Sequence, residues 1–131
     1  MSPDALAIAL EYFAGLTVPQ RAAELLETIA TAIVRAPASW APQMNHLLEL
    51  QIPMPAKHWS DLSERQRADH ARLELLLAEA FQALVLARML IRRETMGPQG
   101  GTIVSYANSP DGRAALERGD AAEVVARRLP D

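Results

Sequence analysis

Residues 73–94, LELLLAEAFQALVLARMLIRRE, constrain the fold more than any other stretch of the sequence. They have the roughly 3.6-residue period of an α-helix, but they contain more apolar residues than one buried stripe needs. At about 100° per residue, one apolar set forms a core face: Leu73, Leu76, Leu77, Ala80, Leu84, Ala87 and Ile91. A second, patchier set lies on the opposite side of the helix: Leu75, Val85, Leu86 and Met89. We therefore expect both faces of this helix to be covered.

Two interpretations account for the second face. In the first, the helix is central, and residues 17–35 and 102–128 of the same chain are available to cover it. In the second, the face is an interface with another copy or another protein, because anchors three, four and seven residues apart suit helix–helix contacts. The predicted interface residues are Leu75, Val85, Leu86 and Met89, with Arg93 at the rim. Each large apolar side chain is worth about 1.5–3 kcal/mol when buried, which favours a covered face.

The sequence as a whole predicts a mainly α fold, a small helical bundle built round one long helix at about 61–95. Shorter helices are expected before it, at 3–14, 17–35 and within 40–50. Thr17 and Gln20 have the spacing of a capping box, and so do Asp61 and Glu64, with Ser60 as the other candidate cap. Gly97 and Pro98 are expected to end the long helix.

The C-terminal part differs from the rest of the chain. Residues 96–131 contain five of the six glycines, and their apolar runs are short. TIVSYA, at 102–107, is the one strand-like run, and a lone strand needs a partner. Ser109-Pro110-Asp111 and Asp120 are typical of helix starts. We therefore divide the chain into a helical domain, 1–95, and a C-terminal segment, 96–131, with one possible strand and two short helices.

Composition narrows the functional classes. Half of the residues are apolar, 22% are charged and the net charge is −3, which is typical of a globular protein without a strong pull on nucleic acid or anionic membranes. Cysteine is absent, so disulfides, thiolate metal sites and cysteine catalysis are excluded. The N-terminus lacks the pattern of a signal peptide, and no charge-free stretch of about 18 residues is present. These features predict a cytoplasmic protein, and twelve arginines against one lysine indicate a bacterial or phage genome.

Residues with catalytic or ligand-binding chemistry are sparse. The three histidines are His46, His58 and His70, and His70 shares a helix face with Glu74. They form no HExxH or ExxH motif, and GPQGG follows a helix rather than a strand, so we predict no metal site and no phosphate loop. We expect no cofactor and no enzymatic activity. Trp40 and Trp59 flank the proline-rich segment and are interpreted as anchors of that loop on the core.

The leading hypothesis is a small cytosolic helical protein that acts by protein–protein binding, as a regulator, antiactivator, inhibitor or chaperone. It is expected to be a homodimer through the long helix. The alternative is a DNA-binding transcriptional regulator that uses the N-terminal helix pair, 3–14 and 17–35. Its base-reading side chains would be Gln20, Arg21, Thr28 and Thr31.

Overall fold

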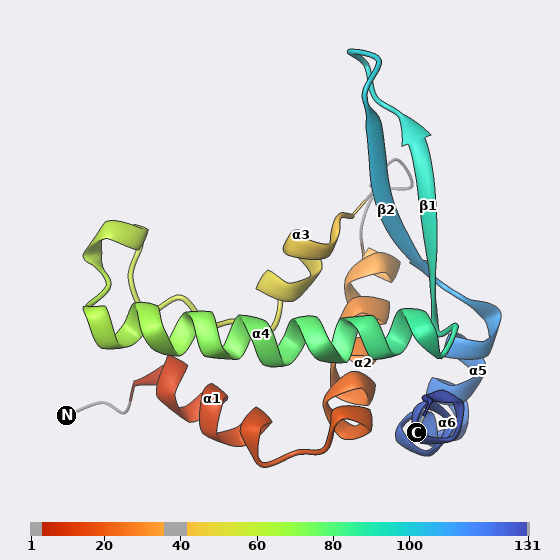
Figure 1. The fold of residues 1–131 in the computed structure, drawn as a ribbon, viewed down its shortest axis with the longest axis horizontal. Helices are drawn as coiled ribbons and strands as arrows, with labels where there is room; N and C mark the ends of the chain where they lie inside the picture. Colours follow the sequence, from red (N-terminus) through yellow and green to blue (C-terminus); the bar gives the residue numbers. More distant parts are fainter. Residues whose placement is uncertain (1–3, 36–41, 131) are drawn as a thin grey trace.

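The computed structural model describes residues 4–35 and 42–130, and this part of the chain is mainly α (Figure 1). In chain order the elements are α1 (Ala5–Ala14), α2 (Val18–Arg35), α3 (Met44–Glu49), the short 3-10 helix η1 (Trp59–Asp61), α4 (Glu64–Leu86), β1 (Leu90–Met96), β2 (Thr102–Asn108), α5 (Pro110–Arg118) and α6 (Ala121–Arg128). α4 lies along the long axis of the molecule, with α2 crossing it and α1 and α3 on either side (Figure 1). α5 and α6 lie at its C-terminal end.

The starts of the helices follow local capping chemistry. Thr17 and Gln20 form the predicted capping box of α2, with Gln20 Oε1 2.9 Å from Thr17 N and Thr17 Oγ1 3.3 Å from Gln20 N. The predicted cap of the long helix is wrong by two or three residues. Ser63 is the N-cap and forms its own capping box with Gln66, whereas Asp61 belongs to η1. Both candidate spacings satisfy the same rule, so the sequence offered no means of choosing between them.

The predicted helix at 61–95 is wrong over its last residues, because α4 ends at Leu86. Ala87 is the C-cap, and Arg88 has a φ of 61°, a left-handed conformation that turns the chain away from the helix axis. The next seven residues form β1, which pairs antiparallel with β2 from Leu90↔Asn108 to Met96↔Thr102. Residues 97–101 are the tip of a hairpin that projects from the helices, rather than a helix cap (Figure 1).

The elements predicted after the hairpin tip are confirmed. The TIVSYA run is β2, and its missing partner is β1. Ser109 caps α5 by accepting a hydrogen bond from Gly112 N at 2.9 Å, with Pro110 in the first turn as expected. α6 then packs against α2 and α5, so its apolar face is buried on the helices.

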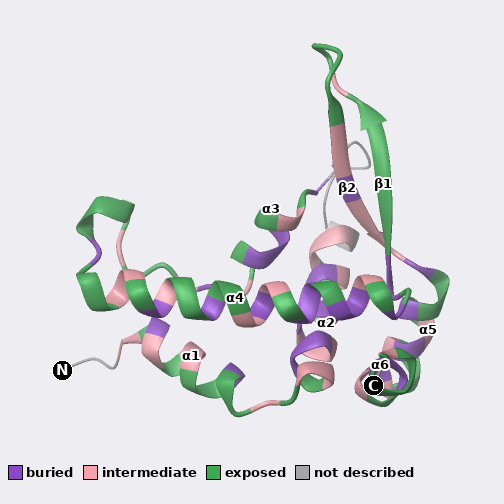
Figure 2. Ribbon diagram, viewed as in Figure 1, coloured by how far each residue is buried: buried purple, intermediate pink, exposed green. Residues whose placement is uncertain are grey.

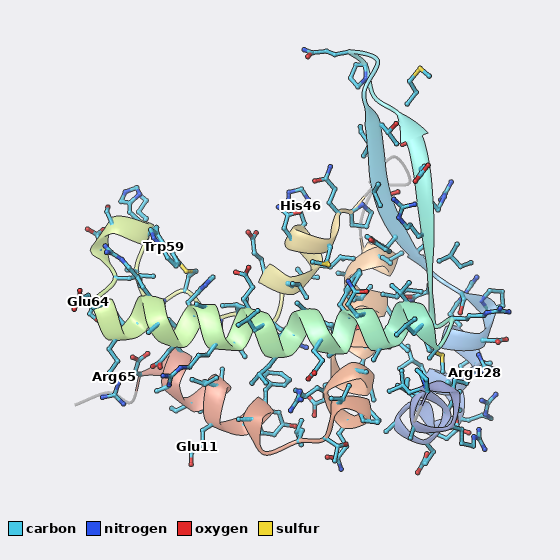
Figure 3. All side chains as sticks on the ribbon, viewed as in Figure 1. Glu11, His46, Trp59, Glu64, Arg65 and Arg128 are labelled. Carbon is cyan, nitrogen blue, oxygen red and sulfur yellow. The ribbon has the colours of Figure 1, made fainter. Side chains whose placement is uncertain are left out.

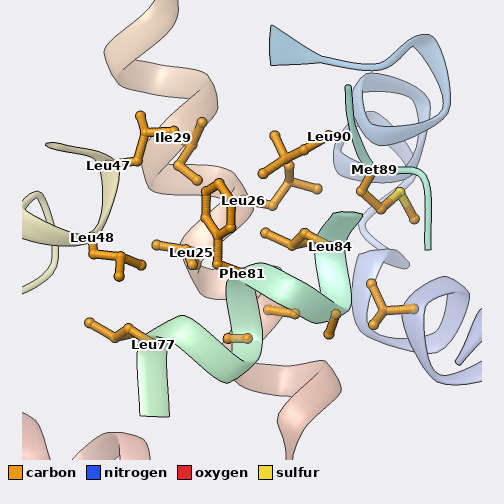
Figure 4. Packing of buried hydrophobic residues seen from close by; sticks show 14 of the residues in the cluster. Leu25, Leu26, Ile29, Leu47, Leu48, Leu77, Phe81, Leu84, Met89 and Leu90 are labelled. Carbon is orange, nitrogen blue, oxygen red and sulfur yellow. The ribbon is translucent and has the colours of Figure 1, made fainter. Parts of the chain in front are cut away.

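The core lies between α4 and α2 and is closed by α1, α3, α6 and the base of the hairpin. Phe81 of α4 sits at its centre, fully buried among leucines of α2, α3 and α4 (Figure 4). Tyr106 of β2 packs edge-on against it, with ring centroids 4.7 Å apart. This contact joins the base of the hairpin to the helices, while most of β1 stays exposed (Figure 2).

The turn at Arg88 and Met89 is held by the N-terminus of α5. Ser109 N donates to Met89 O at 3.0 Å, and Ser109 Oγ donates to Arg88 O at 2.6 Å. Gly112 lies so close to this turn that an added Cβ would be 2.4 Å from Met89 O. A glycine at this position is therefore a requirement of the close approach, although it disfavours a helix on propensity alone.

We expect Gly112→Ala to lower the free energy of unfolding by about 1–3 kcal/mol, the usual cost of forcing an extra group into a packed site. The matched control is Gly101→Ala, because a Cβ at Gly101 meets nothing within 4 Å. Urea unfolding followed by far-UV circular dichroism measures both. Equal midpoints for the two variants would contradict the close approach.

Candidate protein-binding surface on α4

One side of α4 faces the core and the other faces outward. Leu73, Leu77, Phe81 and Leu84 are fully buried on the inner side. On the outer side, Leu75 is 72% exposed and Leu86 is 61% exposed. They are three helical turns apart and therefore share a face, which we call the outward face. It comprises Ala68, Ala71, Leu75, Gln82 and Leu86, all of them exposed.

The structure separates the five predicted interface residues. Leu75 and Leu86 lie on the outward face as expected. Val85 is half-buried and packs against the core cluster. Met89 is fully buried, and Arg93 is exposed on β1 rather than on the helix. The prediction is therefore wrong for Met89 and for the element that carries Arg93, because the helix stops before both residues.

The N-terminal half of the outward face was not identified from the sequence. Ala68 and Ala71 continue the period of Leu75 and Leu86 toward the start of α4. Alanine carries little hydrophobic signal, so an argument from large apolar residues overlooks it. The charged neighbours Arg72 and Glu79 flank this face on one side and are exposed. The surface is thus a ridge with two alanines before Leu75, Gln82 between Leu75 and Leu86, and a charged border.

Arg21 anchors the junction of α1, α2 and α4. Its side chain is 8% exposed, and Nη1 donates to Phe13 O at 2.9 Å and to Leu16 O at 2.5 Å. Nη2 lies 3.1 Å from Glu79 Oε1. The guanidinium thus satisfies carbonyl oxygens at the C-terminal end of α1 and fixes one carboxylate oxygen of Glu79. Because the guanidinium is buried and bound to these partners, it is not available to contact a DNA base.

The other side chains suggested for reading DNA also have partners within the fold. Gln20 belongs to the capping box of α2. Thr31 Oγ1 donates to Glu27 O at 3.0 Å, and Thr28 Oγ1 accepts from Gln51 Nε2. These contacts explain the polar residues of α2 without a nucleic-acid ligand.

We expect Arg21→Ala to destabilise the fold by about 2–3 kcal/mol, because hydrogen bonds to charged groups are worth about 1.5–3 kcal/mol and the carbonyl oxygens of Phe13 and Leu16 would both lose a charged donor. Arg65 is an exposed arginine near the start of α4 (Figure 3) and supplies the matched control, Arg65→Ala. Chemical denaturation of both variants tests the difference. An Arg21→Ala protein as stable as Arg65→Ala would refute the anchoring role.

A second apolar surface lies between α1 and the residues after α3. A hollow of about 550 Å³ is lined there by Ile8, Tyr12 and Leu50, among others, and these three side chains are about half exposed. Tyr12 Oη donates a hydrogen bond to the Glu24 carboxylate, which raises the pKa of Tyr12 above its ordinary value. Desolvation and the charge of Glu24 act in the same direction.

The histidines are spread over separate elements. His46 lies on α3 and His70 lies on α4. Trp59 lies over the N-terminal end of α4 (Figure 3). His70 packs edge-on to Trp59 at 4.8 Å, and its Nδ1 is 3.7 Å from Glu74 Oε2. Trp59 is 49% exposed, so the prediction that it anchors the loop as a buried residue is wrong. Trp40 lies outside the described residues. Within 4–35 and 42–130, no group of three or more His, Asp or Glu side chains could hold a metal ion.

None of the helices that the structure describes is long and apolar enough to cross a membrane. The chain matches no protein-family model, and searches of curated proteins and of solved structures give no significant match.

Proposed function

We propose that this chain acts by binding protein rather than by catalysis, as a small regulator, antiactivator, inhibitor or chaperone, and that it forms a homodimer through α4. The observation that carries the proposal is the exposure of Leu75 and Leu86 on one face of a long helix. Leucines on a shared helix face suit helix-to-helix contacts, and their burial is favourable.

The size of the contact limits its strength. α4 has 23 residues and is about 35 Å long at 1.5 Å per residue. A single helix pair lies at the low end of specific interface areas, below about 1,200 Å² in total. Four leucines contribute about 1.5–3 kcal/mol each when fully buried, and association itself costs about 4–15 kcal/mol. We therefore expect a weak, reversible dimer that dissociates as the protein is diluted.

The main test is the effect of Leu75→Glu and Leu86→Glu on solution mass. We expect the wild-type protein to approach twice 14.3 kDa as its concentration rises, and each variant to remain a monomer. Because both side chains are exposed, helix content should not change, and the melting temperature should match that of the wild type at concentrations where the wild type is a monomer. Light scattering over a concentration series measures the mass, and circular dichroism measures the folding.

The matched control is Ala126→Glu, which adds one negative charge at an exposed apolar position on α6, outside the outward face of α4. It should dimerise like the wild-type protein. A wild-type chain that stays monomeric at every concentration would overturn the homodimer, and loss of helix content in Leu86→Glu would indicate a structural role instead.

The hairpin favours DNA binding as a second candidate function. A two-stranded ribbon is one of the elements that the DNA major groove admits. Arg88 at its base and Arg92 and Arg93 on β1 are exposed, and Glu94, which pairs with Arg92, is the one acid of β1. This ribbon is therefore net positive, although the whole chain has a net charge of −3.

For this candidate, we expect binding to duplex DNA that weakens as salt rises, with each neutralised phosphate contributing about 0.9 to the logarithmic slope. Replacing Arg92 and Arg93 together with alanine should reduce both affinity and slope, while Arg113→Ala on α5 should change neither. Fluorescence anisotropy at several salt concentrations measures both quantities. Equal affinities for the wild type and the double variant would reject the hairpin as a DNA contact.

A further inference from the structure

The outward face of α4 is asymmetric along its length, and this asymmetry carries an inference about its partner. Its large residues are Leu75 at the middle of α4 and Gln82 and Leu86 toward its C-terminal end. Ala68 and Ala71 lie toward the N-terminal end, and the half-buried Ala78 borders the face at its middle. A partner helix that complements this face must therefore be small where α4 is large and large where α4 is small.

We propose that the partner of this face is α4 of a second copy, packed antiparallel and crossing near residues 76 and 77. This inference rests on the proposed homodimer and adds the orientation and register of its contact. The antiparallel register places Leu75 opposite Ala78 of the second copy and Gln82 opposite Ala71, and it brings Leu86 within one residue of the position opposite Ala68. Each contact occurs twice in a two-fold dimer, so every large outward residue meets an alanine.

Charge favours the same orientation. In the antiparallel register, Arg72 of one copy lies near Glu79 of the other, and the symmetry repeats this pair. Arg21 already binds Oε1 of Glu79, so the carboxylate is fixed by its own chain and presented beside the outward face. These two intermolecular ion pairs border the apolar contact on one side.

A parallel pair is disfavoured by the same residues. It would set Leu75 against Leu75 and the alanines against one another, so large and small layers would not interlock. The spacing of flanking residues in a parallel pair would also bring Glu74 close to Glu79 of the second copy, and Arg67 close to Arg72. Like charges would then oppose each other at four places, which favours the antiparallel arrangement.

Cysteine cross-linking distinguishes the two orientations, because the chain contains no native cysteine. In the antiparallel dimer, Ala78 lies about 5 Å along the axis from its own copy, whereas Ala68 lies about 25 Å from its own copy. We expect Ala78→Cys to form a covalent dimer under mild oxidation or with a short bis-maleimide. Ala68→Cys alone should form at least tenfold less covalent dimer.

A mixture of two variants tests the register. Ala68→Cys combined with Leu86→Cys should form a covalent heterodimer, because these positions lie within one residue, about 1.5 Å along the axis, of facing each other across the antiparallel contact. Electrophoresis without reductant measures all the products, and light scattering of the reduced proteins confirms that each variant still dimerises.

The outcomes separate the orientation from the function on which it rests. Self-cross-linking of Ala68→Cys as efficient as that of Ala78→Cys would establish a parallel pair and overturn the inference. A wild-type dimer whose variants give no cross-link at any of these positions would place the interface elsewhere and also overturn it. A monomeric wild-type chain would refute the proposed homodimer itself.

Discussion

The carbonyl oxygens of Arg88 and Met89 join the end of α4 to the start of α5. Ser109 binds both of them, and the close approach of Gly112 leaves no room for a side chain there. This contact fixes the point at which α4 ends, the direction in which the hairpin leaves and the position of the start of α5. The left-handed conformation of Arg88 is maintained because α5 satisfies the carbonyl groups on either side of the turn.

The end of α4 in turn determines which of its residues face outward. With the chain turned away at Arg88, Met89 and Leu90 are buried in the core. Val85 is half-buried and packs against the same core. The inner face is therefore covered by the chain itself, while Leu75 and Leu86 stay exposed. The two interpretations of the apolar helix thus apply to different sets of its residues.

Arginine serves two different purposes in this protein. Arg21 is an interior residue that binds the end of α1 and orients Glu79 beside the outward face of α4. Arg92 and Arg93 lie on an exposed strand far from this junction. Net charge and arginine count are the same whichever role a residue has, so burial and hydrogen bonding are needed to distinguish a structural guanidinium from one available to a partner.

The sequence alone determined the features that depend on neighbours along the chain: the capping box of α2, the cap of α5 at Ser109, the strand-like run at 102–107 and the amphipathic core face of α4 up to Ala87. The predicted continuation of that face to Ile91 is wrong, because Ile91 lies on β1 and is exposed. Tertiary structure decided the rest. LIRRETM contains good helix formers, and its local propensity favours continuing α4. Its pairing with β2 and the docking of α5 on the preceding turn outweigh that propensity. Those partners lie up to 21 residues away along the chain, and no local pattern specifies such long-range contacts. The periodicity that revealed the helix therefore could not show where it ends.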